Sequence, residues 1–138
     1  MIQKFLNRLS LTPRNAELGI SLVLILKGLL LSWASGYFFY PPELAAYLNN
    51  NYLDLLFTLI GTALLISSTM RERILDDKTH NVALNIEKVS LVLAGVAFLA
   101  LATFQITHGA FTVEYRMGHT ALGDMFCFYI TVLTARDV

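Results

Sequence analysis

The sequence has few charged residues and only one cysteine. Charged residues make up 14% of the 138 residues, whereas 56% are hydrophobic. A soluble domain carries about 25% charged residues, so too few polar groups remain here to cover a surface in water. The ten basic and ten acidic side chains cancel, which excludes a nucleic-acid footprint made of net positive charge. The lone Cys127 excludes an internal disulfide framework and a zinc site built on paired thiolates.

The sequence motifs of common catalytic sites are also missing. The chain has no His-Glu-x-x-His zinc motif, no phosphate-binding glycine loop and no Gly-x-Ser-x-Gly elbow. Cys127 lies in an apolar stretch, where burial makes a thiol unreactive. We therefore expect no enzymatic activity and no cofactor.

What the sequence does contain is a set of long apolar stretches between its charges. Four stretches have approximate cores at residues 18–39, 53–70, 89–106 and 120–135, and the only charged residues within them are Lys27, Asp54 and Asp124. A membrane-spanning helix needs about 20 mostly apolar residues, which the first three provide and the fourth approaches. Apolar residues run right round these stretches and leave no polar face for water.

The pattern predicts an all-α integral membrane protein built as a bundle of four transmembrane helices. Residues 1–16 are expected to form a short amphipathic segment on the cytoplasmic surface, and residues 17–138 a single membrane domain. Thr12-Pro13 should separate the two, because proline suits the start of a helix. For the fourth stretch, a half-inserted hairpin is the alternative.

The basic residues lie almost entirely in one set of loops, which predicts the orientation. Positively charged loops stay in the cytoplasm. We therefore expect both termini inside the cell, in a bacterial inner (plasma) membrane. The basic residues on that side are Lys4, Arg8, Arg14, Arg71, Arg73, Lys78, Lys88 and Arg136, and only Arg116 lies in the opposite loops.

Two connecting segments carry their own predictions. Residues 69–81 contain neither glycine nor proline, so they should extend the neighbouring spans as helical ends, with their mixed charges on a solvated face. In residues 107–119, apolar and polar residues alternate between Gly109 and Gly118. This alternation predicts a short extended piece or hairpin, with an irregular loop as the alternative.

Lys27 is the most unusual residue of the first span, since charged residues near the bilayer centre usually pair or mark a functional site. Helical side chains lean toward the amino terminus of their helix, here toward the cytoplasm. This direction favours Glu87 as its partner over Asp124 or Asp54. Alternatively, Lys27 extends its ammonium to the inner headgroups, or takes part in transport or ligand binding.

Small residues recur at every fourth position of the first span, at Gly28, Ser32 and Gly36. Such a strip allows another helix backbone to approach closely. We expect the strip to pack within the chain, against surfaces that include Gly61 and Gly95, or to dock onto another subunit.

Three functional hypotheses follow. The first is a non-enzymatic protein that contacts another membrane protein, as an accessory subunit or an immunity or exclusion factor. The second is a self-assembling channel or small transporter that uses Lys27. The third is a haem- or metal-binding redox subunit that uses His108 and His119, which lie at the ends of the last two spans.

Overall fold

The computed structural model describes residues 12–34, 42–73, 76–112 and 118–138, and all regular structure in these ranges is helical. Residues 1–11, which carry most of the predicted amphipathic segment, lie outside the described residues. The helices are α2 (Pro13–Trp33), α3 (Pro42–Leu48), α4 (Asn51–Arg73), α5 (Asp77–Thr112) and α6 (Gly118–Asp137).

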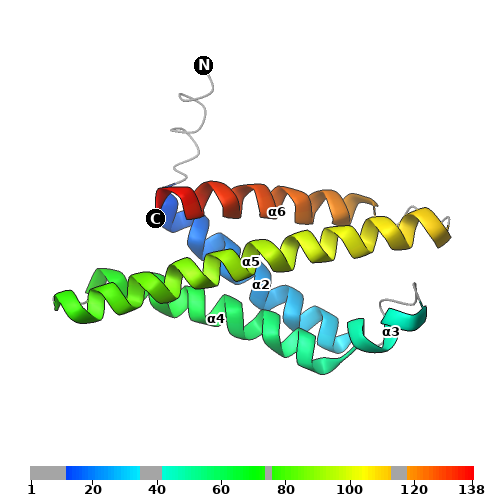
Figure 1. Cartoon of the computed structure of the whole chain (residues 1–138), viewed down its shortest axis with the longest axis horizontal. Coiled ribbons are helices and arrows are strands. Elements are labelled where there is room, and N and C mark those ends of the chain that lie inside the picture. Colours follow the sequence, from blue (N-terminus) through cyan, green and yellow to red (C-terminus); the bar gives the residue numbers. More distant parts are fainter. Residues whose placement is uncertain (1–11, 35–41, 74–75, 113–117) are drawn as a thin grey trace, which may run out of the picture.

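The four long helices pack side by side (Figure 1). Helix α2 lies along α4, α4 along α5, and α5 along α6, while α6 also contacts α2. The start of α2, the end of α4, the start of α5 and the end of α6 all lie toward one end of the molecule (Figure 1). We call this the Arg71 end, after the arginine near the end of α4.

The start of α2 confirms the predicted break at Thr12-Pro13. Thr12 caps the helix, because its Oγ1 accepts a hydrogen bond from the backbone N–H of Asn15 at 3.3 Å, and Pro13 occupies the first helical turn. Residues 13–16 therefore belong to the first long helix rather than to a separate segment. The helix ends at Trp33, before the predicted boundary at residue 39, and residues 35–41 lie outside the described part.

The predicted helical extension of residues 69–81 is confirmed, because α4 continues to Arg73 and α5 begins at Asp77. With 36 residues, α5 is about 54 Å long, well beyond the predicted span 89–106. Its helix reaches Thr112, so the expectation of an extended piece is wrong for residues 107–112, while residues 113–117 lie outside the described part. The connection predicted after the first span also contains the short helix α3, which begins at Pro42.

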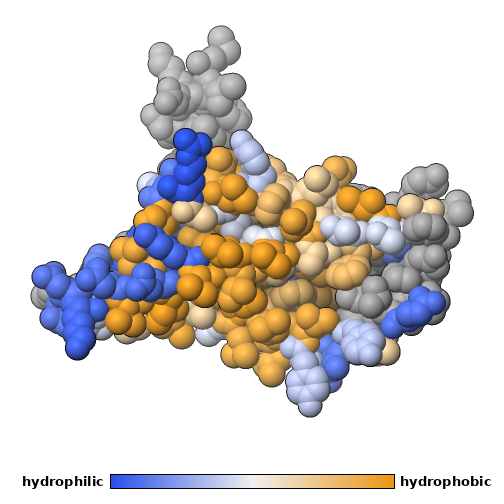
Figure 2. Space-filling view, viewed as in Figure 1, coloured by the Kyte–Doolittle hydropathy of each residue, from blue (hydrophilic) through white to orange (hydrophobic). Residues whose placement is uncertain are grey.

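More polar side chains are buried, and more large apolar side chains are exposed, than in a typical water-soluble protein. Leu24, Leu64, Leu91 and Phe98 form the centre of an apolar core, but twelve polar or charged residues in the described part of the chain are buried as well. Large apolar side chains cover the exterior of all four long helices, and the face in Figure 2 shows them as a broad apolar area between more polar ends. Exposed apolar area of this extent marks a surface that meets lipid or protein.

Helices α2, α4 and α5 are each long and apolar enough to cross a membrane. Helix α6, with 20 residues and a length of about 30 Å, is not among the helices that meet both criteria. The structure therefore supports membrane association through three helices.

Candidate functional site: buried charges and a cavity

The Lys27 ammonium of α2 forms an ion pair with the Asp124 carboxylate of α6. The Asp124 side chain is fully buried, whereas 26% of the Lys27 side chain is exposed. An unpaired charge at such a position costs several kcal/mol, so each partner makes the other tolerable there. The pair also links α2 to α6, whose mutual contact is the smallest among the neighbouring long helices.

The partner favoured from the sequence, Glu87, was wrong. Lys27 lies six residues before the end of α2 at Trp33, and Asp124 lies six residues after the start of α6 at Gly118. Because the two helices run in opposite directions (Figure 1), these positions come to the same level. The first span was predicted at residues 18–39, whereas the helix covers Pro13–Trp33. The predicted span therefore put Lys27 too close to the middle of the helix.

Glu87 pairs instead with Arg71 at the Arg71 end. Arg71 Nη1 donates a hydrogen bond to Glu87 Oε1 at 2.7 Å, and Arg71 Nη2 lies 4.0 Å from Glu17 Oε1. Both glutamate side chains are fully buried, while 24% of the Arg71 side chain is exposed. One guanidinium therefore connects α2, α4 and α5 through two carboxylates.

This cluster corrects the interpretation of residues 69–81 as a wholly solvated charged face. Arg71 turns inward because it lies one helix turn past buried Ser67 and Ser68, on the same side of α4. Arg73 remains exposed, as the sequence predicts. A planar guanidinium with five N–H donors suits contact with two carboxylates.

The small residues of α2 pack within the chain. A Cβ atom on Gly28 would lie 2.6 Å from the carbonyl oxygen of Asp54 in α4. A Cβ on Gly61 of α4 would lie 2.8 Å from the carbonyl oxygen of Ser21 in α2. The two helix backbones therefore approach closely at two points, where Gly28 and Gly61 leave room for the facing backbone.

The remaining residues predicted to pack are Ser32, Gly36 and Gly95. Ser32 is exposed, and Gly36 lies outside the described residues. Gly95 of α5 faces α6, where an added Cβ would make ordinary contact with Phe128 and Thr131 at 3.8 Å.

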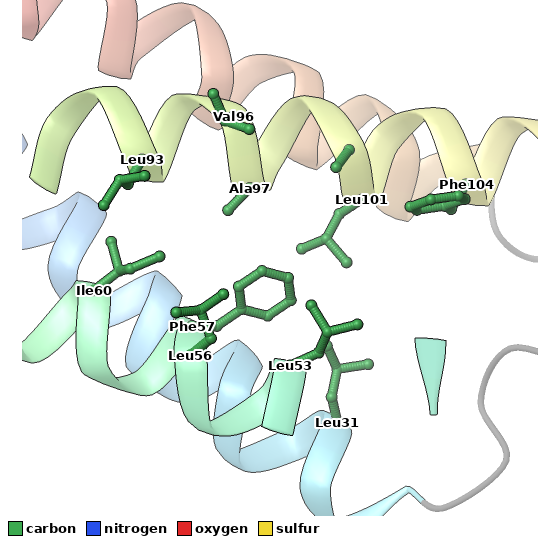
Figure 3. Close-up of a pocket in the computed structure, with 11 residues that line it drawn as sticks. Leu31, Leu53, Leu56, Phe57, Ile60, Leu93, Val96, Ala97, Leu101 and Phe104 are labelled. Atoms are coloured by element: carbon green, nitrogen blue, oxygen red, sulfur yellow. The ribbon is translucent and has the colours of Figure 1, made fainter. Parts of the chain in front are cut away.

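Two of the cavities between the described helices include residues of α2 in their walls. The first, of about 210 Å³, is an apolar groove between α4 and α5, which Leu31 of α2 completes (Figure 3). The second, of about 300 Å³, lies beside the ion pair and is lined by Lys27, Leu30, Leu31, Ala34, Leu101, Gln105 and Thr120.

The chain matches no protein-family model, no curated protein and no solved structure.

Of the two histidines of the third hypothesis, His108 is fully buried in α5, while the side chain of His119 lies outside the described residues. Among the described residues, no group of three or more histidine, cysteine, aspartate or glutamate side chains is arranged to hold a metal ion.

Sequence reasoning missed three residues of these sites. Glu17 and Arg71 lie at the ends of apolar stretches on the same predicted side of the membrane, and this shared position could have suggested that they are close. Gln105 is the only amide side chain in the third stretch, and this feature could have marked it as a candidate.

Proposed function

We propose that the protein crosses a bacterial inner membrane four times, with both termini in the cytoplasm. The distribution of side chains on α6 supports the fourth span. Ala121, Asp124 and Thr131 are buried against the other helices, whereas Leu122 and Phe126 are more than 60% exposed. A helix with its polar side chains inward and its apolar side chains outward suits lipid, and its length of about 30 Å matches the hydrocarbon core.

The side of the membrane on which the carboxyl terminus lies tests this topology. A fluorescent protein fused after Val138 should fluoresce, and alkaline phosphatase fused there should stay inactive, because folding of the first requires the cytoplasm and activity of the second requires the periplasm. Fusions after Asn49 should give the reverse. An active phosphatase after Val138 would show that α6 does not cross.

Within this topology, we propose that the protein acts without catalysis, by contact with a second integral membrane protein. It would serve as an accessory subunit or as an immunity or exclusion factor. The apolar groove between α4 and α5 is the observation that carries this proposal. Its lining side chains are carbon only (Figure 3), and a helix of another membrane protein can fill such a groove through its side-chain ridges.

The charges of the chain support the same proposal. Lys27 and Arg71 are each paired with carboxylates inside the chain. The central exterior is left with apolar side chains, which interact in the membrane by packing rather than by charge.

Photo-crosslinking in the source cell tests the contact. A benzophenone amino acid in place of Val96, which lies in the groove and is 61% exposed, should give a covalent adduct with one other membrane protein. The same replacement at Val132, which is 48% exposed on α6, is the matched control and should give lipid adducts only. Lipid adducts alone at both positions would refute a partner in the groove.

The Lys27–Asp124 pair favours a second candidate, a small transporter or self-assembling channel. The pair lies beside a cavity of about 300 Å³, and charged residues that face such cavities often mark a substrate path. Replacing both Lys27 and Asp124 by leucine should abolish solute flux into proteoliposomes if this candidate holds. An unchanged rate of solute entry for the double variant would leave the contact function as the better account.

A further inference from the structure

The cavity beside Lys27 combines apolar walls with three polar residues. Leu30, Leu31 and Ala34 of α2 and Leu101 of α5 form the apolar part, and the polar part comes from Lys27, Gln105 and Thr120. Ligand sites in proteins typically show this pattern, in which a few polar groups orient a ligand held mainly by apolar contacts. The cavity lies at the lower end of the usual range of ligand-site volumes, about 300–1,000 Å³.

Gln105 is the observation that points to a ligand. Its side chain is only 3% exposed, and its Oε1 atom accepts no hydrogen bond in the structure. A buried acceptor without a donor costs free energy, and such atoms are rare in folded proteins. Since Gln105 lines the cavity, a molecule inside the cavity can supply the missing donor.

Lys27 sets the second requirement. Its ammonium has three N–H donors, and its ion pair is to a single carboxylate. A ligand atom that accepts a hydrogen bond can therefore use another of these donors. The charge of Lys27 is already balanced by Asp124, so an added charged group would be buried without a counter-ion of its own.

We propose that this cavity binds a neutral molecule with an apolar body and a hydroxyl group. The hydroxyl donates a hydrogen bond to Gln105 Oε1 and accepts one from Lys27 Nζ. A hydrocarbon of the same shape leaves Gln105 unsatisfied, and a carboxylate or an ammonium ion brings an unbalanced charge. The proposal goes beyond the contact function and does not depend on it. The cavity shares Leu31 and Leu101 with the groove in Figure 3, but the polar residues that would recognise the ligand line the cavity alone.

A pair of matched probes tests the hydroxyl. 4-Butylphenol and butylbenzene share the apolar body and differ in one hydroxyl group. Binding to the purified full-length protein in detergent is measured by the rise in its unfolding temperature, with each probe expressed as its mole fraction in the micelle. We expect saturable binding of 4-butylphenol about tenfold tighter than that of butylbenzene, the factor expected for a net hydrogen-bond gain.

Three variants test whether the preference for 4-butylphenol over butylbenzene arises in this cavity. Gln105→Leu keeps a side chain of similar length but removes the acceptor, so the preference for the phenol should fall to about equal binding of the two probes. Ala34→Trp, at an exposed position of the cavity wall, should block both probes. Thr103→Val, at an exposed position of α5 outside the cavity wall, is the control and should behave as the wild type.

The outcomes separate clearly. Equal binding of the two probes to the wild type, no saturable binding of either, or a preference that survives Gln105→Leu would overturn the proposal. If Gln105→Leu does not fold, Ala34→Trp still decides whether the probe occupies this cavity. The photo-crosslinking at Val96 reads a different surface, so its failure and the failure of this proposal are distinguishable.

The natural hydroxyl can come from a membrane lipid or from a small molecule, and competition separates the two. Diacylglycerol added to nanodiscs at increasing mole fraction should displace 4-butylphenol if the source is a lipid with a free hydroxyl. Unchanged binding of the probe would assign the cavity to a small alcohol or phenol instead.

Discussion

The Lys27–Asp124 pair allows a prediction in which the two partners have unequal effects. Asp124 is fully buried, whereas 26% of the Lys27 side chain is exposed. Lys27→Met leaves a carboxylate in the interior without its counter-ion, which costs about 3–5 kcal/mol of the free energy of unfolding. Asp124→Leu leaves a lysine whose flexible stem can move its ammonium toward a polar region, so its cost should be smaller, about 1–3 kcal/mol.

The double variant isolates the interaction itself. Lys27→Met combined with Asp124→Leu removes both charges, and replacing a buried ion pair by apolar residues is often neutral or stabilising. We expect the double variant to lie within about 1 kcal/mol of the wild type. Because the two single costs together amount to about 4–8 kcal/mol, the coupling energy should be at least about 3 kcal/mol. The assay is reversible unfolding in mixed micelles of dodecyl maltoside and sodium dodecyl sulfate, followed by circular dichroism.

A second cycle serves as the control. Lys27→Met and Glu87→Gln should show additive effects within about 0.5 kcal/mol, because Glu87 pairs with Arg71 at the other end of the bundle. Additivity of the Lys27 and Asp124 variants, or coupling between Lys27 and Glu87, would refute the assignment of the partner.

Three further predictions concern stability, all measured in the same micelle assay. Arg71→Met should cost about 3–5 kcal/mol of the free energy of unfolding, because it leaves Glu17 and Glu87 buried without their guanidinium. Arg73→Met, at an exposed position, should change it by less than about 1 kcal/mol, and equal effects of the two variants would contradict the inward position of Arg71. Gly28→Ala should cost about 1–3 kcal/mol by forcing α2 and α4 apart, and a neutral effect would show that the close approach is absent. The control Gly19→Ala should be neutral or stabilising, because a Cβ there meets nothing within 4 Å. Thr12→Ala should cost about 1 kcal/mol through loss of the helix cap, and an unchanged stability would contradict the capping bond.

The helices were largely predictable because the positions of charges in the sequence decide which stretches can enter lipid. The long intervals without charge fall within α2, α4 and α5, and the absence of glycine and proline after Thr69 correctly predicted that α4 and α5 extend past the apolar stretches. Helix ends were less predictable. The start of the first helix followed from Thr12-Pro13, but its end did not, because α2 ends at Trp33 whereas the predicted span extended to residue 39.

The partners of the buried charges could not be predicted from the same information. The sequence indicated that Lys27 could pair with an acidic residue, but Asp54, Glu87 and Asp124 all lie near the ends of the other stretches. The choice among them depends on which helices touch and at what level. That arrangement follows from close contacts such as Gly28 against the backbone of α4, which only the folded chain reveals.

The central claim is that the apolar exterior of this bundle faces lipid while its polar side chains lie inside. Its most direct test is a spin label at position 132 of α6, in a Cys127→Ala background and in lipid vesicles. Val132 is 48% exposed in the structure. The account predicts that the label collides much more often with oxygen, which dissolves in lipid, than with a water-soluble nickel complex. Frequent collisions with the nickel complex at this position would contradict it.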